Sequence, residues 1–145
     1  MAGVSGEGTL QLPVRLHGIQ LGRPVDLIVD PPSGRALGFD VLCGDDVHRF
    51  LPIAAAQLGD DEIAVGSSLM LLEDVAFYRK RGESLRELRG RPVRRGRREL
   101  GVLLDLTVDR DGTLLEVVLD RDGSELRAPF DRSLDLRAGS SASAA

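Results

Sequence analysis

Few residues in this sequence combine the types and the spacing that catalysis or metal binding requires. The carboxylates of residues 45–46 and 60–62 could serve as an acid–base pair, and His17, His48 and Cys43 could ligate zinc. An acid–base pair needs a cleft that shifts its pKa, whereas both acidic runs lie in turn-like segments. Zinc needs three or four ligands in compact spacing, and these three residues are spread over predicted strands. We therefore expect no catalytic residue, no metal site and no bound cofactor.

Two Asp-Arg-Asp-Gly segments, residues 109–112 and 120–123, resemble the start of a calcium-binding loop. Such a loop places an oxygen ligand at its fifth position and a bidentate Glu at its twelfth. Here Thr113 and Ser124 occupy the fifth position, the twelfth is Asp rather than Glu, and a predicted strand intervenes. Asp-Gly between apolar runs is a strong hairpin signal, because glycine readily adopts a positive φ. We interpret both segments as hairpin turns.

The arginines are unevenly distributed along the chain. Residues 79–98 contain ten cationic side chains and only two acidic ones, although the whole chain has a net charge of −4. A solvated connecting segment is the simplest reading, but guanidinium groups also suit carboxylates and phosphates. Residues 79–98 contain no aromatic side chain on which nucleic-acid bases could stack. An acidic protein or a second copy of this protein is therefore favoured over RNA as the partner. The candidate partner-binding residues are Arg91, Arg94, Arg95, Arg97 and Arg98.

Composition indicates a small bacterial cytoplasmic protein. Of 145 residues, 42% are hydrophobic and only 3% aromatic, so the core must consist mainly of Leu and Val. Cys43 is the only cysteine, which excludes a disulfide within the chain and fits a reducing compartment. We find no secretory signal and no apolar run long enough to span a membrane.

One pattern in this chain occurs twice. Pro13-Val14-Arg15 returns 79 residues later as Pro92-Val93-Arg94, and Asp26-Leu27 returns as Asp105-Leu106. After a one-residue deletion, Gly34 matches Gly112. Self-similarity at a fixed offset indicates one structural unit built twice.

The elements that carry this pattern are mostly strands. Two-residue alternation or short apolar runs predict strands at 10–16, 25–30, 37–41, 47–52, 103–108, 113–119 and 125–130. Pro13 should confine the first of these to an edge or a bulge. A single helix is predicted from Glu73-Asp74 to Gly82, with acid at its start and base at its end, and a short helical turn at 54–56.

The doubled pattern resembles the PRC-barrel family. Its elements are a Gly-x-x-Val strand start, a Gly, Leu-Gly, an Asp-x-x-Val-Asp hairpin, a Gly turn, a Leu-rich strand and a return strand ending near Pro. In the second half these elements are Gly90 to Val93, Gly96, Leu100-Gly101, Asp105 to Asp109, Gly112 and Leu115 to Leu119. In the first half they are Val14, Leu21-Gly22, Asp26 to Asp30, Gly34, Leu37 to Val41 and Phe50 to Pro52. The first half departs from the pattern where His17 replaces the glycine found at Gly96.

This resemblance implies a mainly all-β fold of two small antiparallel PRC-type β-barrels joined by a short helix. We expect a flexible N-terminus at 1–9, a first barrel-like repeat with the linking helix at 10–82, a second repeat at 83–137 and a disordered tail at 138–145. The second repeat is short, so either the first repeat or another subunit must complete its barrel.

Known PRC barrels are adaptors, for example in the photosynthetic reaction-centre H subunit and in a bacterial ribosomal RNA maturation factor. They share no catalytic motif. The resemblance therefore implies a non-catalytic adaptor that binds a protein partner or itself. The alternatives are a protein associated with RNA or the ribosome, a small-molecule binder with a groove between the barrels, and a peripheral accessory protein of a photosynthetic or membrane complex.

Overall fold

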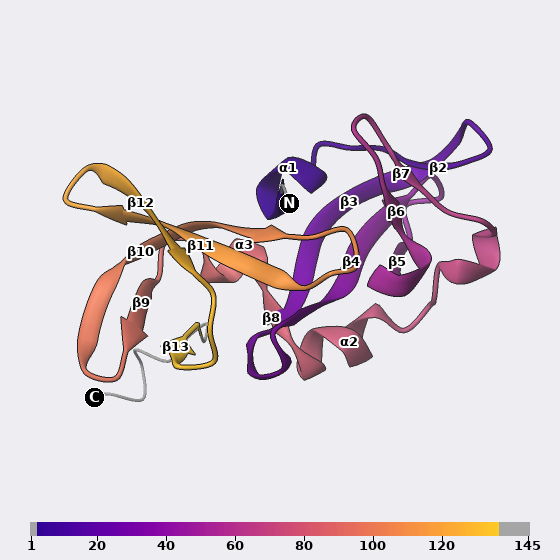
Figure 1. The fold of residues 1–145 in the computed structure, drawn as a ribbon. Coiled ribbons are helices and arrows are strands. Elements are labelled where there is room, and N and C mark those ends of the chain that lie inside the picture. Colours follow the sequence, from indigo (N-terminus) through magenta and orange to yellow (C-terminus); the bar gives the residue numbers. More distant parts are fainter. Residues whose placement is uncertain (1–2, 137–145) are drawn as a thin grey trace.

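The computed structural model describes residues 3–136, which form two antiparallel-rich sheets (Figure 1). The first sheet has seven strands in the order β5-β4-β3-β2-β7-β6, with β8 added beside β3. Its strands are β2 (Val14–Leu16), β3 (Ile19–Asp30), β4 (Arg35–Cys43), β5 (His48–Pro52), β6 (Gln57–Leu58), β7 (Ile63–Ala64) and β8 (Glu83–Ser84).

The second sheet has six strands in the order β12-β11-β10-β9-β13, with β1 added beside β10. Its strands are β1 (Val4–Ser5), β9 (Pro92–Arg95), β10 (Arg98–Val108), β11 (Leu114–Arg121), β12 (Ser124–Pro129) and β13 (Leu134–Asp135). These two sheets confirm the predicted mainly β fold. The strand pairings of the described residues leave both sheets open, so the two closed barrels stay an expectation.

Short helical segments connect the strands. They are α1 (Gly6–Thr9), α2 (Val75–Arg81), α3 (Leu85–Leu88) and the 3₁₀ turns η1 (Pro31–Ser33), η2 (Ile53–Ala55) and η3 (Ser68–Met70). The predicted helix before Gly82 is confirmed as α2, where the Asp74 carboxylate accepts the Phe77 N–H at 3.1 Å. None of the helices among residues 3–136 is both long and apolar enough to cross a membrane.

The two sheets exchange their short added strands. β1, at the start of the chain, pairs with β10 through Ser5 and Thr107, and β8, which follows α2, pairs with β3 through Ser84 and Ile28. Residues 4–9, which composition predicts to be flexible, form β1 and α1. The second sheet is thus completed by the N-terminal end of the same chain. The predicted tail at 138–145 lies outside the described residues.

The β-hairpin ends of the two sheets meet in a reciprocal contact. The Ala36 N–H donates to the Gly112 carbonyl at 2.7 Å, and the Leu114 N–H donates to the Gly34 carbonyl at 2.9 Å. Gly34 corresponds to Gly112, and Ala36 to Leu114, at the same offset of 78 positions. Equivalent residues therefore form the same hydrogen bond in both directions, as in a contact across a two-fold axis.

One continuous apolar core lies between the sheets. Leu27 and Val29 of β3 and Leu106 and Val108 of β10 are all fully buried within it. These inward-facing residues alternate with Ile28 and Thr107, which point to the opposite faces of their sheets. The two halves consequently fold around a shared core rather than around two separate ones.

The local turn predictions hold, but one strand is shorter than its alternation predicts. Asp122 and Gly123 have φ of 54° and 85°, as a two-residue hairpin turn requires. Of the predicted strand at 10–16, only Val14–Leu16 is extended. The N–H groups of residues 10–12 bond back to the carbonyls of residues 7–9, so α1 ends in a turn instead.

Candidate functional site

The predicted arginine rim lies on the β9–β10 hairpin. Arg95 is engaged: its Nη2 lies 2.7 Å from the Asp131 carboxylate, and its Nε donates to the Ser133 hydroxyl at 3.0 Å. Hydrogen bonds from Ser133 and the charge of Arg95 lower the pKa of Asp131. Arg94 lies 3.8 Å from Glu99. Acidic neighbours thus already offset part of the predicted basic surface.

The other three rim arginines are less constrained. Arg91 donates from Nε to the Glu87 carbonyl at 3.3 Å. Arg97 and Arg98 are exposed at the tip of the hairpin and form no ion pair within the described part of the chain. The structure therefore places four of the arginines on one hairpin and Arg91 directly before it, with Arg97 and Arg98 the most available to a partner.

The most unusual polar cluster is a pair of buried carboxylates that sequence reasoning missed. Asp26 on β3 and Asp40 on β4 are directly opposite each other, and each residue is only 2% exposed. Two neighbouring buried carboxylates repel each other and need a cation. The available signal was a charged residue inside each of two apolar strands.

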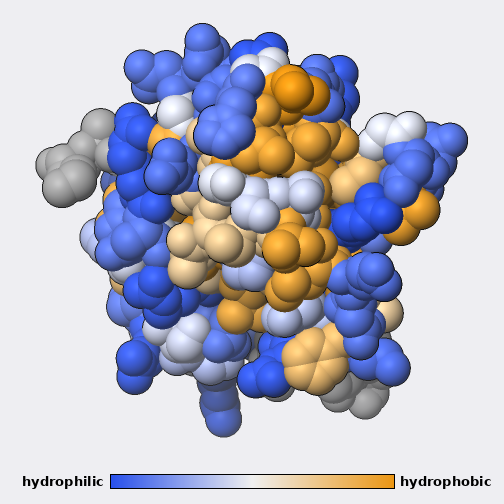
Figure 2. All heavy atoms as spheres, turned by 90° about the vertical axis from the view of Figure 1, so that its right-hand side faces the viewer, coloured by the Kyte–Doolittle hydropathy of each residue, from blue (hydrophilic) through white to orange (hydrophobic). Residues whose placement is uncertain are grey.

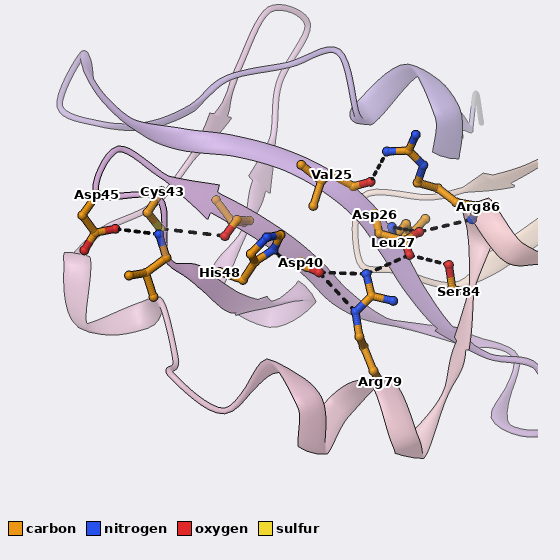
Figure 3. Close-up of polar contacts among 12 residues, drawn as sticks. Val25, Asp26, Leu27, Asp40, Cys43, Asp45, His48, Arg79, Ser84 and Arg86 are labelled. Carbon is orange, nitrogen blue, oxygen red and sulfur yellow. Dashed lines mark hydrogen bonds and ion pairs between the residues drawn. The ribbon is translucent and has the colours of Figure 1, made fainter.

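Arg79 of α2 supplies that cation (Figure 3). Its Nη2 lies 2.8 Å from Asp40 Oδ2 and 3.2 Å from Asp26 Oδ2, and its Nε donates to Asp40 at 3.2 Å. Partial burial lowers the pKa of Arg79, but the hydrogen bond and charge of Asp40, with the charge of Asp26, outweigh it and raise the pKa overall. The guanidinium thus holds α2 on the first sheet.

Asp26 also organises the backbone around it. Its Oδ1 accepts the N–H groups of Leu27 at 2.9 Å and Arg86 at 3.2 Å, and its Oδ2 accepts the hydroxyl of Ser84 (Figure 3). This carboxylate therefore ties the start of α3 and the exchanged strand β8 to β3.

His48 completes the cluster but does not create a catalytic triad. Its Nδ1 lies 2.8 Å from Asp40 Oδ1, and its side chain is about half exposed. A histidine oriented by a buried carboxylate can act as a general base. However, the Ser84 hydroxyl donates to Asp26 and not to His48, so the cluster contains no activated serine. We interpret the cluster as a structural clamp.

An equivalent carboxylate lies in the second sheet. Asp105, 79 residues after Asp26, accepts the N–H groups of Leu106 at 2.8 Å and Glu7 at 2.9 Å, and the hydroxyl of Ser5. Its cross-strand neighbour is Val118, where the first sheet has Asp40. Asp105 forms no ion pair with any described residue.

An apolar area occupies one end of the molecule. Figure 2 shows it as a continuous orange region on the end formed by the first sheet and η3. A groove of 460 Å³ there is lined by Leu21, Leu69 and Leu71. Leu69 is 84% exposed, Met70 is 43% exposed, and Ile19, which begins β3 two residues before Leu21, is 68% exposed. We call these five residues the apolar end.

The described residues contain no cluster of side chains suited to a metal ion. In the turn at 109–112, Asp109 accepts the N–H groups of Asp111 and Thr113 at 2.9 and 3.0 Å. Hydrogen bonding with Asp109 and from Thr113 lowers the pKa of Asp111 to about 2. These carboxylates are engaged within their own turn, which fits the hairpin interpretation.

The candidate zinc ligands differ in their surroundings. Cys43 is buried, whereas His17 is exposed in a tight turn.

No protein-family model matches this chain, and no similar curated protein is found. The likeness to PRC barrels therefore rests on the sequence pattern alone.

Proposed function

We propose that this protein is a non-catalytic protein-interaction module of the PRC-barrel type, which binds its main partner at the apolar end. The observation that carries the proposal is the exposure of Leu69, 84% of whose surface faces solvent beside an apolar groove. Contiguous exposed apolar surface, as opposed to scattered single residues, is typical of protein interaction sites.

The energetic argument supports a protein partner. Burying one leucine side chain from water contributes roughly 1.5–3 kcal/mol, and Met70 and Ile19 would add to that at the same end. The groove is rimmed by Asp45, Arg49 and Glu73, which gives the apolar centre and polar rim usual for protein interfaces.

The arginine rim is a proposed secondary contact. Because Glu99 and Asp131 partly neutralise Arg94 and Arg95, the rim suits a protein with mixed charges better than a uniformly charged nucleic-acid backbone. Arg97 and Arg98 are the residues proposed to meet acidic groups of the partner.

The experiment compares Leu69→Asp with Leu126→Asp in partner capture from native lysate and in sedimentation of the purified protein. Leu126 is a matched control, since it is 41% exposed but lies on β12 in the other sheet. We expect Leu69→Asp to lose the captured protein or the self-association, while the control keeps it. Equal retention by both variants would remove the apolar end from the proposal.

A further inference from the structure

Among residues 3–136, the two sheets differ in what covers the face that carries Asp26 and its equivalent, Asp105. Helix α2 covers the face of the first sheet that carries Asp26 and Asp40, and it runs along the lower side of that sheet in Figure 1. The same place over Asp105 in the second sheet is a groove of 420 Å³. The groove is lined by residues of β1, α1, β10, β11 and β12, together with Arg89 after α3.

The charges of this groove leave one carboxylate uncompensated. Glu7 lies 3.0 Å from Arg89, and Glu125 lies 3.7 Å from Arg127, so these four side chains form two ion pairs. Within the described part of the chain, the hydrogen bonds that Asp105 accepts come from uncharged groups. In the first sheet Arg79 supplies the positive charge to the equivalent Asp26. A cation that enters the groove would restore that arrangement.

An unpaired buried hydroxyl also points to a ligand in this groove. Thr107 lines the groove and is only 7% exposed, yet its Oγ1 has no hydrogen-bond partner among the described residues. The equivalent residue of the first sheet is Ile28, which has no such requirement. A buried polar group without a partner is costly and is normally explained by a missing ligand or water.

Helix α2 also contacts the first sheet through an aromatic side chain, and the groove has a residue that could accept the same kind of contact. Tyr78 stacks on Phe50 with ring centroids 3.9 Å apart. Phe50 lies opposite Asp40, and Arg127 lies opposite Val118, so Arg127 takes the place of Phe50 in the second sheet. A guanidinium also stacks on an aromatic ring.

We propose that this groove binds a short helical segment of a partner protein that presents adjacent aromatic and arginine side chains, the arginine to Asp105 and the aromatic ring to Arg127. The segment takes the position that α2 takes on the first sheet. The surface is distinct from the apolar end, so this inference goes beyond the function proposed above and gives the adaptor a second docking site.

The test uses the sequence of α2 itself as the probe. A synthetic peptide of residues 72–82 is titrated into the ¹⁵N-labelled full-length protein, in which the first site is already occupied by α2. We expect amide shifts at Asp105, Thr107 and Arg127. An Arg79→Gln peptide should bind about tenfold more weakly, because one charge-assisted hydrogen bond to Asp105 is lost.

Variants of the protein sharpen the result. Asp105→Asn should weaken binding about tenfold, whereas Asp61→Asn, an equal change of charge at an exposed position, should leave it unchanged. Val118→Asp rebuilds the carboxylate pair and should strengthen binding.

Three outcomes would overturn the inference: no shifts at millimolar peptide, shifts confined to β4 and β5, or equal affinity for the two peptides. The peptide comparison on the unmodified protein decides the matter even if Asp105→Asn does not fold. Leu69→Asp should leave peptide binding intact, so failure of the groove and failure of the apolar end are distinguishable.

Discussion

Replacing Arg79 by alanine tests whether one guanidinium holds α2 on the first sheet. None of the residues of α2 is buried, so the helix depends on the Arg79 ion pairs and on the Tyr78 stack. The substitution leaves the buried carboxylates of Asp26 and Asp40 facing each other without a cation. Removing one partner of a buried ion pair costs roughly 3–5 kcal/mol, and we expect about 3 kcal/mol because Arg79 is 37% exposed.

Urea unfolding provides the measurement. With a slope of about 2 kcal/mol per molar urea, the unfolding midpoint should fall by about 1.5 M. Lys80→Ala, an exposed cation on the same helix, should change the free energy of unfolding by less than about 0.5 kcal/mol. Amide exchange in α2 should accelerate in the Arg79 variant only.

A double-mutant cycle isolates the interaction itself. Asp40→Val introduces the residue that the second sheet has at Val118, and removes one of the two repelling charges. In that background Arg79→Ala should cost about 1–2 kcal/mol less than it does in the unmodified protein. Two results would refute the clamp. One is an equal loss of unfolding free energy from Arg79→Ala in both backgrounds. The other is a loss below about 1 kcal/mol when Arg79→Ala is the single change.

Two further predictions address packing and pH. Gly38→Ala should destabilise the protein by about 3 kcal/mol in urea unfolding, because a Cβ there would lie 2.2 Å from the Leu51 carbonyl oxygen. Gly66→Ala is the control and should be close to neutral, because a Cβ there would have no atom within 4 Å. Equal effects of the two substitutions would contradict the packing argument. The pKa of Asp111 is lowered from 3.8 to about 2 in the folded state, so its stabilising contribution is complete above pH 3.8 and is lost as the pH falls towards 2. Asp111→Asn should therefore be less stable than the unmodified protein at neutral pH, and this difference should shrink through that acidic range; a constant difference would count against it.

Local sequence signals predicted the local structure well. Asp74 and Gly82 bracket α2 as the cap and charge pattern indicates, and Asp122-Gly123 forms the expected hairpin turn. These features depend on a few neighbouring residues and on allowed backbone conformations, which the sequence states directly. The same reasoning did not predict β1 at residues 4–5, because β1 is held by its pairing with β10, about a hundred positions away.

The buried cluster was beyond local reasoning. Asp26, Asp40 and Arg79 come from two strands and a helix, and nothing in the spacing of the three indicates that they meet. Sequence matching did align Asp26 with Asp105, but it could not show that one carboxylate has a cation and the other lacks one. Arg79, by contrast, was counted only as part of a basic segment.

The sequence by itself determined the doubled pattern of strands, the turns between them and the short helix that links the halves, because each depends on side-chain periodicity and backbone preference over a few residues. Only the tertiary structure decided that β1 and β8 exchange between the sheets, that a single core forms and that α2 covers one acidic face but not the other. Those outcomes depend on which distant surfaces bury the most apolar area and neutralise buried charge, and that balance exists only once the chain has folded.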